Sequence, residues 1–274
     1  MIRKISICLF LIMLTFNQTG RVGAAELLTP SQFIDRSGMD VFLVSFGAGI
    51  KSVTSNPRYA KKFKFRAAWE KAASVTVSAS VLRAIMIRQI KNTISEKENR
   101  RYSEFLSSPL GLRVTEIERQ AQRFEIRQLV LKNGMKILQG QSKKRNAMLV
   151  DIVTSMKMEE TIMALTMNSM LAILKGMKAA SLFPGSLTDE KIIQMSQHQG
   201  KVIALQTMKD VPASMAYTYS KLSDQELSSY SKFLGTDFGK KITGKIFHVL
   251  ERTIETAVEE FGRQLVYRLN QKHT

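Results

Sequence analysis

The sequence predicts an all-α protein built from two tandem copies of one helical unit. Residues 102–115 (YSEFLSSPLGLRVT) match residues 230–243 (YSKFLGTDFGKKIT) at a constant offset of 128 positions (230 − 102). A Ser-x-x-Glu capping box, typical of a helix N-terminus, precedes each copy at Ser95 and Ser223. No stretch sustains the apolar–polar alternation of a strand. We therefore expect long helices packed as bundles, and no sheet.

Residues 1–25 have the pattern of a signal peptide. Arg3 and Lys4 precede an apolar run over residues 5–16, which is too short for a comfortable membrane span. Cleavage would make the protein periplasmic or secreted, and an uncleaved anchor is the alternative. Because the only cysteine, Cys8, lies in this segment, the mature chain could form neither disulfides nor thiolate metal sites.

The first copy is assigned to residues 26–140. Proline after a capping residue marks helix starts at Thr29-Pro30, Asn56-Pro57 and Ser108-Pro109. Apolar spacing predicts a buried helix over 39–53 and a single long helix over 56–91. A short helix begins at Ser95, and a second long helix runs from 109 to 140.

The polar segment 141–146 is the predicted linker, and residues 147–274 form the second copy. A helix is expected over 147–180, and another begins at 188. Pro212 predicts a kink or break in that second helix. After the capping box at Ser223, the last helix should run over 238–270.

The repeated motif has the pattern of a helix corner. In the short helix, one aromatic–apolar face repeats; it comprises Tyr102, Phe105 and Leu106 in the first copy, and Tyr230, Phe233 and Leu234 in the second. The serines cap with Glu98 and Glu226. Gly111 and Gly239 then lie in the first turn of the next helix, where glycine costs about 1 kcal/mol. Their recurrence predicts the close approach of another backbone; a ligand site built on the two glycines is the alternative.

These residues resemble a bacterial secreted family known as domain of unknown function 2059, whose pattern is Leu-Ser-x-x-Glu-Leu followed by Phe-Tyr-x-Ser-Pro-x-Gly-x-Lys. The first copy keeps Phe105, Ser108, Pro109 and Gly111, with Leu106 for the tyrosine and Arg113 at the basic position. The second keeps Leu222, Ser223, Glu226, Leu227, Phe233, Gly239 and Lys241, with Asp237 for the proline. The resemblance implies a helical envelope protein and brings no catalytic residues.

No motif predicts catalysis, a metal or a cofactor. His198, His248 and His273 lie far apart in the sequence, and no cluster has zinc-ligand spacing. Glu251, Glu255 and Glu259 share one helix face, and paired carboxylates can act as acid and base. With Arg252 nearby and Arg263 spaced to pair with Glu259, however, a solvated charged face is favoured.

Methionine and basic residues suggest two binding surfaces. Met156, Met163, Met170 and Met177 recur every seven residues, with Met167 between them; core packing is favoured, and a partner groove or a soft-metal site are the alternatives. The chain has a formal net charge of +18. Cations concentrate at Arg58, Lys61, Lys62, Lys64 and Arg66, at the positive end of an expected helix. This placement suggests an anion site for lipid headgroups or envelope polymers, and a solvated basic loop is the alternative.

Together these patterns favour a non-enzymatic interaction or accessory module of the bacterial cell envelope, with an envelope protein as partner. The alternative is a basic binder of an anionic membrane surface or polymer, and a hydrolase without a recognisable motif is the third. Nucleic acid is not expected, because a secreted protein seldom meets it.

Overall fold

The computed structural model describes residues 26–55, 65–179 and 187–271. These residues form twelve α-helices and two 3-10 turns and contain no strand, which confirms the all-α prediction. The expected signal peptide lies outside the described residues.

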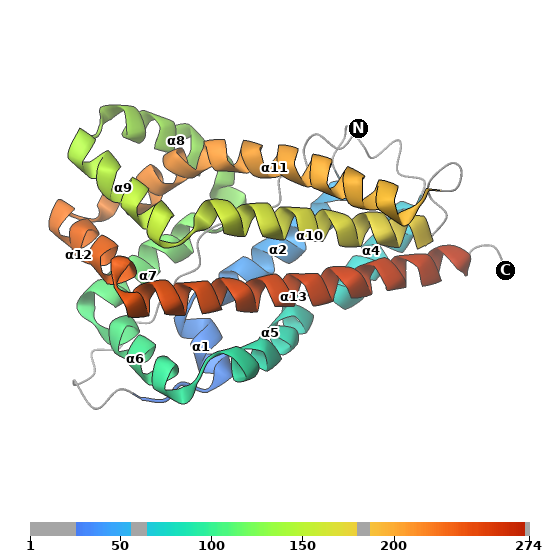
Figure 1. The fold of residues 1–274 in the computed structure, drawn as a ribbon, viewed down its shortest axis with the longest axis horizontal. Coiled ribbons are helices and arrows are strands. Elements are labelled where there is room, and N and C mark those ends of the chain that lie inside the picture. The colour runs from blue at the N-terminus through green and yellow to red at the C-terminus, as the bar shows by residue number, and fades with distance from the viewer. Residues whose placement is uncertain (1–25, 56–64, 180–186, 272–274) are drawn as a thin grey trace.

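The helices follow one another with short connections (Figure 1). Up to residue 140 they are α1 (Pro30–Arg36), α2 (Met39–Ser55), α4 (Arg66–Thr76), α5 (Ala79–Thr93), α6 (Glu96–Ser107), α7 (Pro109–Ala121), η1 (Phe124–Ile126) and α8 (Arg127–Gly140). They continue as α9 (Lys143–Ser155), α10 (Met158–Ala179), α11 (Asp189–Thr218), η2 (Tyr219–Lys221), α12 (Asp224–Gly235) and α13 (Asp237–Asn270).

Three long helices form the body of the molecule. Figure 1 shows α10, α11 and α13 side by side; α10 contacts both of the others, and α4 and α5 pack on α13. One apolar core runs through both copies, from Leu28 and Leu82 to Ile242 and Leu265. Trp69 of α4 meets Phe261 of α13 edge-on at 4.6 Å between ring centroids. The two copies therefore share one main core, and a smaller apolar cluster around Met170 and Ile192 lies apart from it.

Each of three expected long helices is broken. The first divides at Val77-Ser78 into α4 and α5, which meet at 43°. There a Cβ on Gly47 of α2 would lie 2.4 Å from the Val77 carbonyl oxygen, so α2 packs directly on the break. The run of β-branched residues around the break also disfavours a continuous helix.

The other two expected long helices are also interrupted. The helix expected over 109–140 stops at Ala121, and the Oγ of Ser45 donates to the Gln122 carbonyl oxygen at 3.0 Å. The helix expected over 147–180 is interrupted at Lys157, which has a left-handed φ of 48°. A helical turn reaches into the predicted linker as well, because Ser142 caps α9 and α9 begins at Lys143.

The helix break expected at Pro212 does not occur, because α11 continues past this residue to Thr218. Proline has no N–H, so the Met208 carbonyl lacks its ordinary helical donor at this point. Packing of α11 against α8 supports the helix here. A Cβ on Gly134 of α8 would lie 2.0 Å from the Ala213 carbonyl oxygen, so the two backbones are in close contact.

No single helix in the described ranges is long and apolar enough to cross a membrane. The bent pair α4 and α5 passes a test of length and composition when the two are taken together. Their apolar side chains, such as Trp69, Ala72, Leu82 and Met86, are buried in the protein core.

Candidate functional site

The two repeat motifs pack against each other. Phe105 of α6 stacks on Phe233 of α12, with ring centroids 3.8 Å apart and planes 4° apart. Tyr102 and Tyr230 are both buried, and each ring stacks at 6.2 Å from that of Phe105. Equivalent positions of the repeat therefore form one aromatic cluster at the junction of the two copies.

The glycines of the motif meet the end of the preceding helix. A Cβ on Gly111 would lie 1.9 Å from the Phe105 carbonyl oxygen, and one on Gly239 would lie 2.1 Å from that of Phe233. This is the close backbone approach that the repeated glycines predict. Because backbone already fills the space, a ligand built onto these glycines has no room there.

Ion pairs between the two copies also join equivalent positions of the repeat. Both predicted capping boxes are present, at Ser95 with Glu98 and at Ser223 with Glu226. Arg113 of the first copy pairs with Glu226 at 2.9 Å, and the equivalent Lys241 of the second copy pairs with Glu98 at 3.0 Å. Such reciprocity is that of a two-fold interface, formed here within one chain.

The junction also encloses a carboxyl group. Glu118 of α7 is fully buried, and its Oε1 accepts hydrogen bonds from the hydroxyls of Tyr219 and Tyr230. Burial raises the pKa of Glu118 to about 8, against the lowering effect of the two tyrosine hydrogen bonds. Its Oε2 has no hydrogen-bond partner in the structure. The group is therefore neutral at neutral pH and closed off from substrates.

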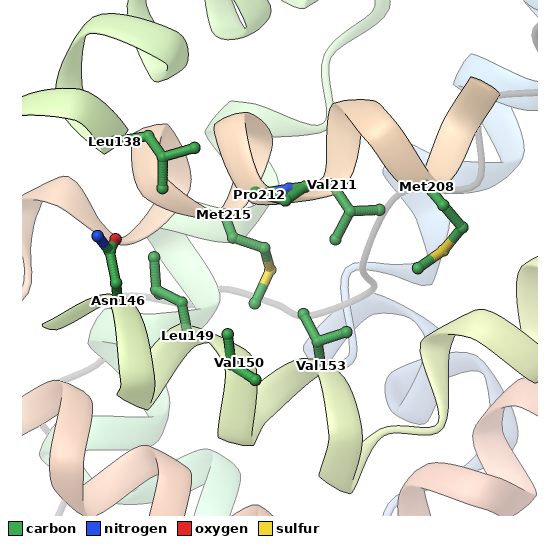
Figure 2. A pocket seen from close by; sticks show the side chains of 9 residues that line it. All are labelled: Leu138, Asn146, Leu149, Val150, Val153, Met208, Val211, Pro212 and Met215. Carbon is green, nitrogen blue, oxygen red and sulfur yellow. The ribbon is translucent and has the colours of Figure 1, made fainter. Parts of the chain in front are cut away.

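An apolar groove lies between α8, α9 and α11 (Figure 2). It has a volume of about 160 Å³ and is lined by Leu138, Asn146, Leu149, Val150, Val153, Met208, Val211, Pro212 and Met215. Leu149, Val211 and Met215 are buried, whereas Val150 is 61% exposed. Asn146 is the only polar residue of the lining.

Two helices supply matched stripes to this groove. The lining residues of α9 and of α11 each follow the spacing i, i+3, i+4, i+7, which places them on one face of their helix. In Figure 2 the side chains of Met208, Val211 and Met215 point toward those of Leu149, Val150 and Val153. Leu205, one turn before Met208, is 45% exposed and extends the apolar surface along α11.

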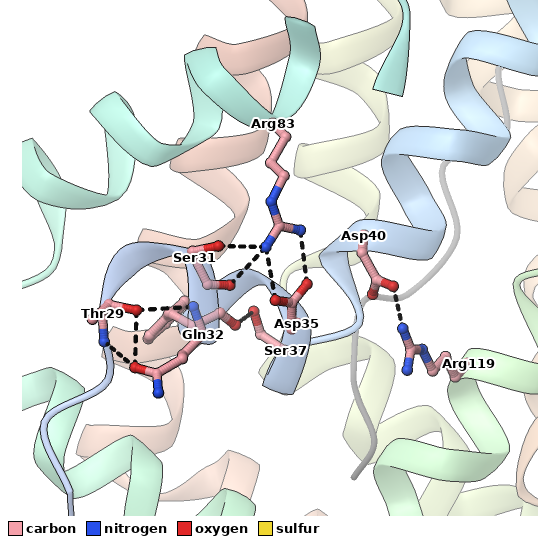
Figure 3. A network of polar contacts seen from close by, with 9 residues as sticks. Thr29, Ser31, Gln32, Asp35, Ser37, Asp40, Arg83 and Arg119 are labelled. Atoms are coloured by element: carbon pink, nitrogen blue, oxygen red, sulfur yellow. Dashed lines mark hydrogen bonds and ion pairs between the residues drawn. The ribbon is translucent and has the colours of Figure 1, made fainter. Parts of the chain in front are cut away.

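A polar network holds the N-terminal helices (Figure 3). Arg83 of α5 binds both carboxylate oxygens of Asp35 at 2.7 Å, and Arg119 of α7 pairs with Asp40 of α2. Arg83 also donates to the hydroxyl of Ser31 at 2.6 Å. These charges neutralise one another, so the network ties α1 and α2 to the bundle.

The predicted methionines are mostly interior. Met156 and Met170 are buried, Met163 and Met167 are partly buried, and the side chain of Met177 is outside what the structure describes. Met163 packs on the main core, and Met167 packs against Gly200 of α11. The groove uses other methionines, Met208 and Met215. Their stripe was readable in the sequence, but the proline within it suggested a helix end.

The other residues predicted as candidate sites form no common site within the described ranges. Arg58, Lys61, Lys62 and Lys64 lie outside the described residues, and Arg66 pairs with Glu70 at 2.7 Å. His198 and His248 are exposed on different helices, and His273 is not described. No group of three or more His, Cys, Asp or Glu suited to a metal occurs within the described ranges.

On the last helix, Glu251 accepts a hydrogen bond from Asn168 at 3.1 Å, and Glu255 pairs with Arg252. The expected pairing of Arg263 with Glu259 is wrong. Arg263 pairs with Glu260 instead, three residues away, and Glu259 is exposed. Glu251 and Glu255 therefore have side-chain partners, and Glu259 is exposed to solvent.

Comparisons of the chain with models of known protein families, with curated proteins and with solved structures found no match.

Proposed function

We propose that this protein is a non-enzymatic interaction module of the bacterial cell envelope, and that it docks the apolar face of a partner protein's helix. The docking site is the groove between α8, α9 and α11. The observation that carries the proposal is this groove, because it is apolar, open on one side, and lined by regularly spaced side chains of two helices.

The size of the groove favours a protein segment over a small molecule. Sites for drug-sized ligands and cofactors occupy roughly 300–1,000 Å³, about two to six times the 160 Å³ found here. A cavity of about 150 Å³ holds a molecule the size of benzene. The groove therefore fits one large apolar side chain, which is how an anchor residue of a partner protein binds.

The shape of the lining favours a helix. Amphipathic helices bind in apolar grooves through anchors spaced at i, i+3 or i+4, and i+7. The stripes on α9 and α11 provide complementary walls of about 10 Å, which is the rise of seven helical residues. Two methionines in the lining suit such a surface, since a flexible thioether adapts to different side chains.

The chemistry of the groove suits binding rather than catalysis. Its single polar residue, Asn146, accepts a hydrogen bond from Gln141 through Oδ1. A lining without an ionisable group supplies no general acid, base or nucleophile. The envelope location rests on the signal-peptide pattern of residues 1–25 and on the family resemblance of the repeat motif.

Site-specific photocrosslinking in cells tests the proposal. A crosslinker replaces Val150 in the groove, and a control crosslinker replaces Glu104, which is exposed on α6. We expect one protein to be captured from Val150 and not from Glu104. After purification it should bind the wild type at least tenfold more tightly than Val150→Asp. Equal binding to both forms would remove the groove as the docking site.

A further inference from the structure

We infer that the helix docked in this groove is acidic, with a carboxylate that faces Lys143 at the start of α9. The inference rests on the proposed function and specifies the chemistry of the partner. It is carried by cations without partners beside an apolar surface.

The helices around the groove are strongly basic. Residues 127–155, which include α8 and α9, hold six basic residues and one acidic residue, Asp151. Arg145 is occupied within the fold, since it pairs with Asp224 and donates to the carbonyl oxygens of Tyr219 and Leu222 at 2.6 and 2.8 Å. That pairing fixes the start of α9 against α12 and leaves the neighbouring lysines on a rigid support.

Four lysines on these helices have no ion-pair partner among the described residues, and all are exposed: Lys132, Lys136, Lys143 and Lys144. Lys143 is the closest to the groove by helical spacing, because it precedes Asn146 by three residues and Val150 by seven. A side chain bound near Val150 therefore lies about 10 Å along α9 from Lys143. That separation is two turns of a docked helix.

The two lysines at the start of α9 also lie at the positive end of the helix dipole, where cations are disfavoured. Lys143, Lys144 and Arg145 make up the first turn, which contains no acid, although the N-terminus of a helix favours negative charge. Arg145 is compensated by Asp224. Lys143 and Lys144 lack such compensation within the described fold, so an external carboxylate would relieve the local repulsion as well as pair with the ammonium groups.

The acids near the groove do not cancel this charge. Asp151 is exposed and follows Val150, while Asp210 of α11 is half-buried. Burial raises the pKa of Asp210, and the nearby positive charge of Arg127 lowers it. Glu159 and Glu160 lie at the start of α10, beyond the Val153 end of the groove. Lys157, four residues after Val153, and Lys209, next to Met208, are exposed as well, so the acids at this end lie among cations.

Synthetic peptides test the inference on the full chain. Three labelled amphipathic peptides share one leucine face and carry Glu, Gln or Lys on the polar face, and binding is measured by fluorescence anisotropy at low and high salt. The test variant is Lys143→Glu with Lys144→Glu. Its control, Lys91→Glu with Lys97→Glu, changes the net charge equally at exposed lysines of α5 and α6.

We expect the Glu peptide to bind about tenfold more tightly than the Gln peptide at low salt, and the Lys peptide to bind least. The test variant should remove this preference and the control should keep it. Equal binding of the Glu and Gln peptides, with no effect of the test variant, would overturn the inference. Sensitivity of both peptides to Val150→Asp would then still support the proposed groove.

Two further outcomes separate the remaining explanations. If Val150→Asp leaves the binding of every peptide unchanged, the proposed function fails together with the inference. Vesicles of anionic phospholipid are added as competitor. Suppose that the vesicles displace the Glu peptide from the wild-type protein, and that they bind the wild type but not the variant with Lys143→Glu and Lys144→Glu. The lysines then serve a membrane surface, and the acidic-helix inference is wrong.

Discussion

Glu118 and Ile246 occupy equivalent positions of the repeat, 128 residues apart (246 − 118), and both are buried. One copy therefore places an acid where the other places a hydrocarbon. The acid is accommodated because Tyr219 and Tyr230, both from the second copy, donate hydrogen bonds to it. The junction of the two copies is thus symmetric in its aromatic stacking and asymmetric in its polar core.

This burial predicts a pH-dependent stability. The pKa of Glu118 is raised to about 8 in the folded chain, from an ordinary value of 4.5. The folded state therefore holds a proton that the unfolded state has lost. Stability should fall by roughly 2–5 kcal/mol as pH rises from about 4.5 to about 8, and then level off. Urea unfolding of the wild type and Glu118→Gln across this range measures it, and the variant should lose this slope.

The repeated glycines predict a large effect of one methyl group. Gly111→Ala and Gly239→Ala should each destabilise the fold by more than about 2 kcal/mol, because the new Cβ overlaps a carbonyl oxygen. Gly244→Ala in α13 is the control, since a Cβ there meets nothing within 4 Å. That change should stabilise by about 0.5–1 kcal/mol. A Gly111→Ala protein as stable as the wild type would show that the corner can relax.

The two capping glutamates should differ in importance. The side chain of Glu98 is 9% exposed and that of Glu226 is 32% exposed. Burial raises the pKa of Glu98, but hydrogen bonds from Lys245, the Ser95 backbone and Lys241 lower it to about 2. Glu98→Gln should cost about 1.5–3 kcal/mol near neutral pH, and Glu226→Gln about 1 kcal/mol or less.

The stabilisation by Glu98 should depend on pH within a definite range. Because the pKa of Glu98 is depressed in the folded state, its contribution is complete above about 4.5 and declines as pH falls toward 2. Denaturation of the two variants at pH 7 and pH 3 checks both statements. Equal costs of the two substitutions at pH 7 would contradict the larger contribution predicted for Glu98.

Pro212 predicts a conflict between stability and binding. Pro212→Ala should stabilise the protein by about 1–2 kcal/mol, because alanine restores the hydrogen bond to the Met208 carbonyl and suits a helix interior. The same change shortens the exposed rim of the groove. Thermal unfolding and peptide binding, measured together, should show higher stability with weaker binding. Unchanged binding would mean that Pro212 does not contact the docked helix.

Much of the local structure was predictable because its causes lie within a few residues. The capping serines need only a glutamate three positions later, and Gly111 and Gly239 lie six residues after the carbonyl that requires them. The all-α class follows from apolar spacing in the same way. The repeat also identified Phe105 and Phe233 as equivalent, although it did not indicate that the two rings stack on each other.

The sequence by itself determined the fold class, the capped helix starts at Thr29, Ser95, Ser108 and Ser223, and the paired corners, since each depends on short-range hydrogen bonds and spacing. Only the tertiary structure decided where the long helices break, that α11 continues through Pro212, and that Glu118 is enclosed by tyrosines 101 and 112 residues away. It also brought the stripes of α9 and α11 together as a groove. The physical reason is that packing energy between distant segments outweighs the local propensity of about 1 kcal/mol per residue.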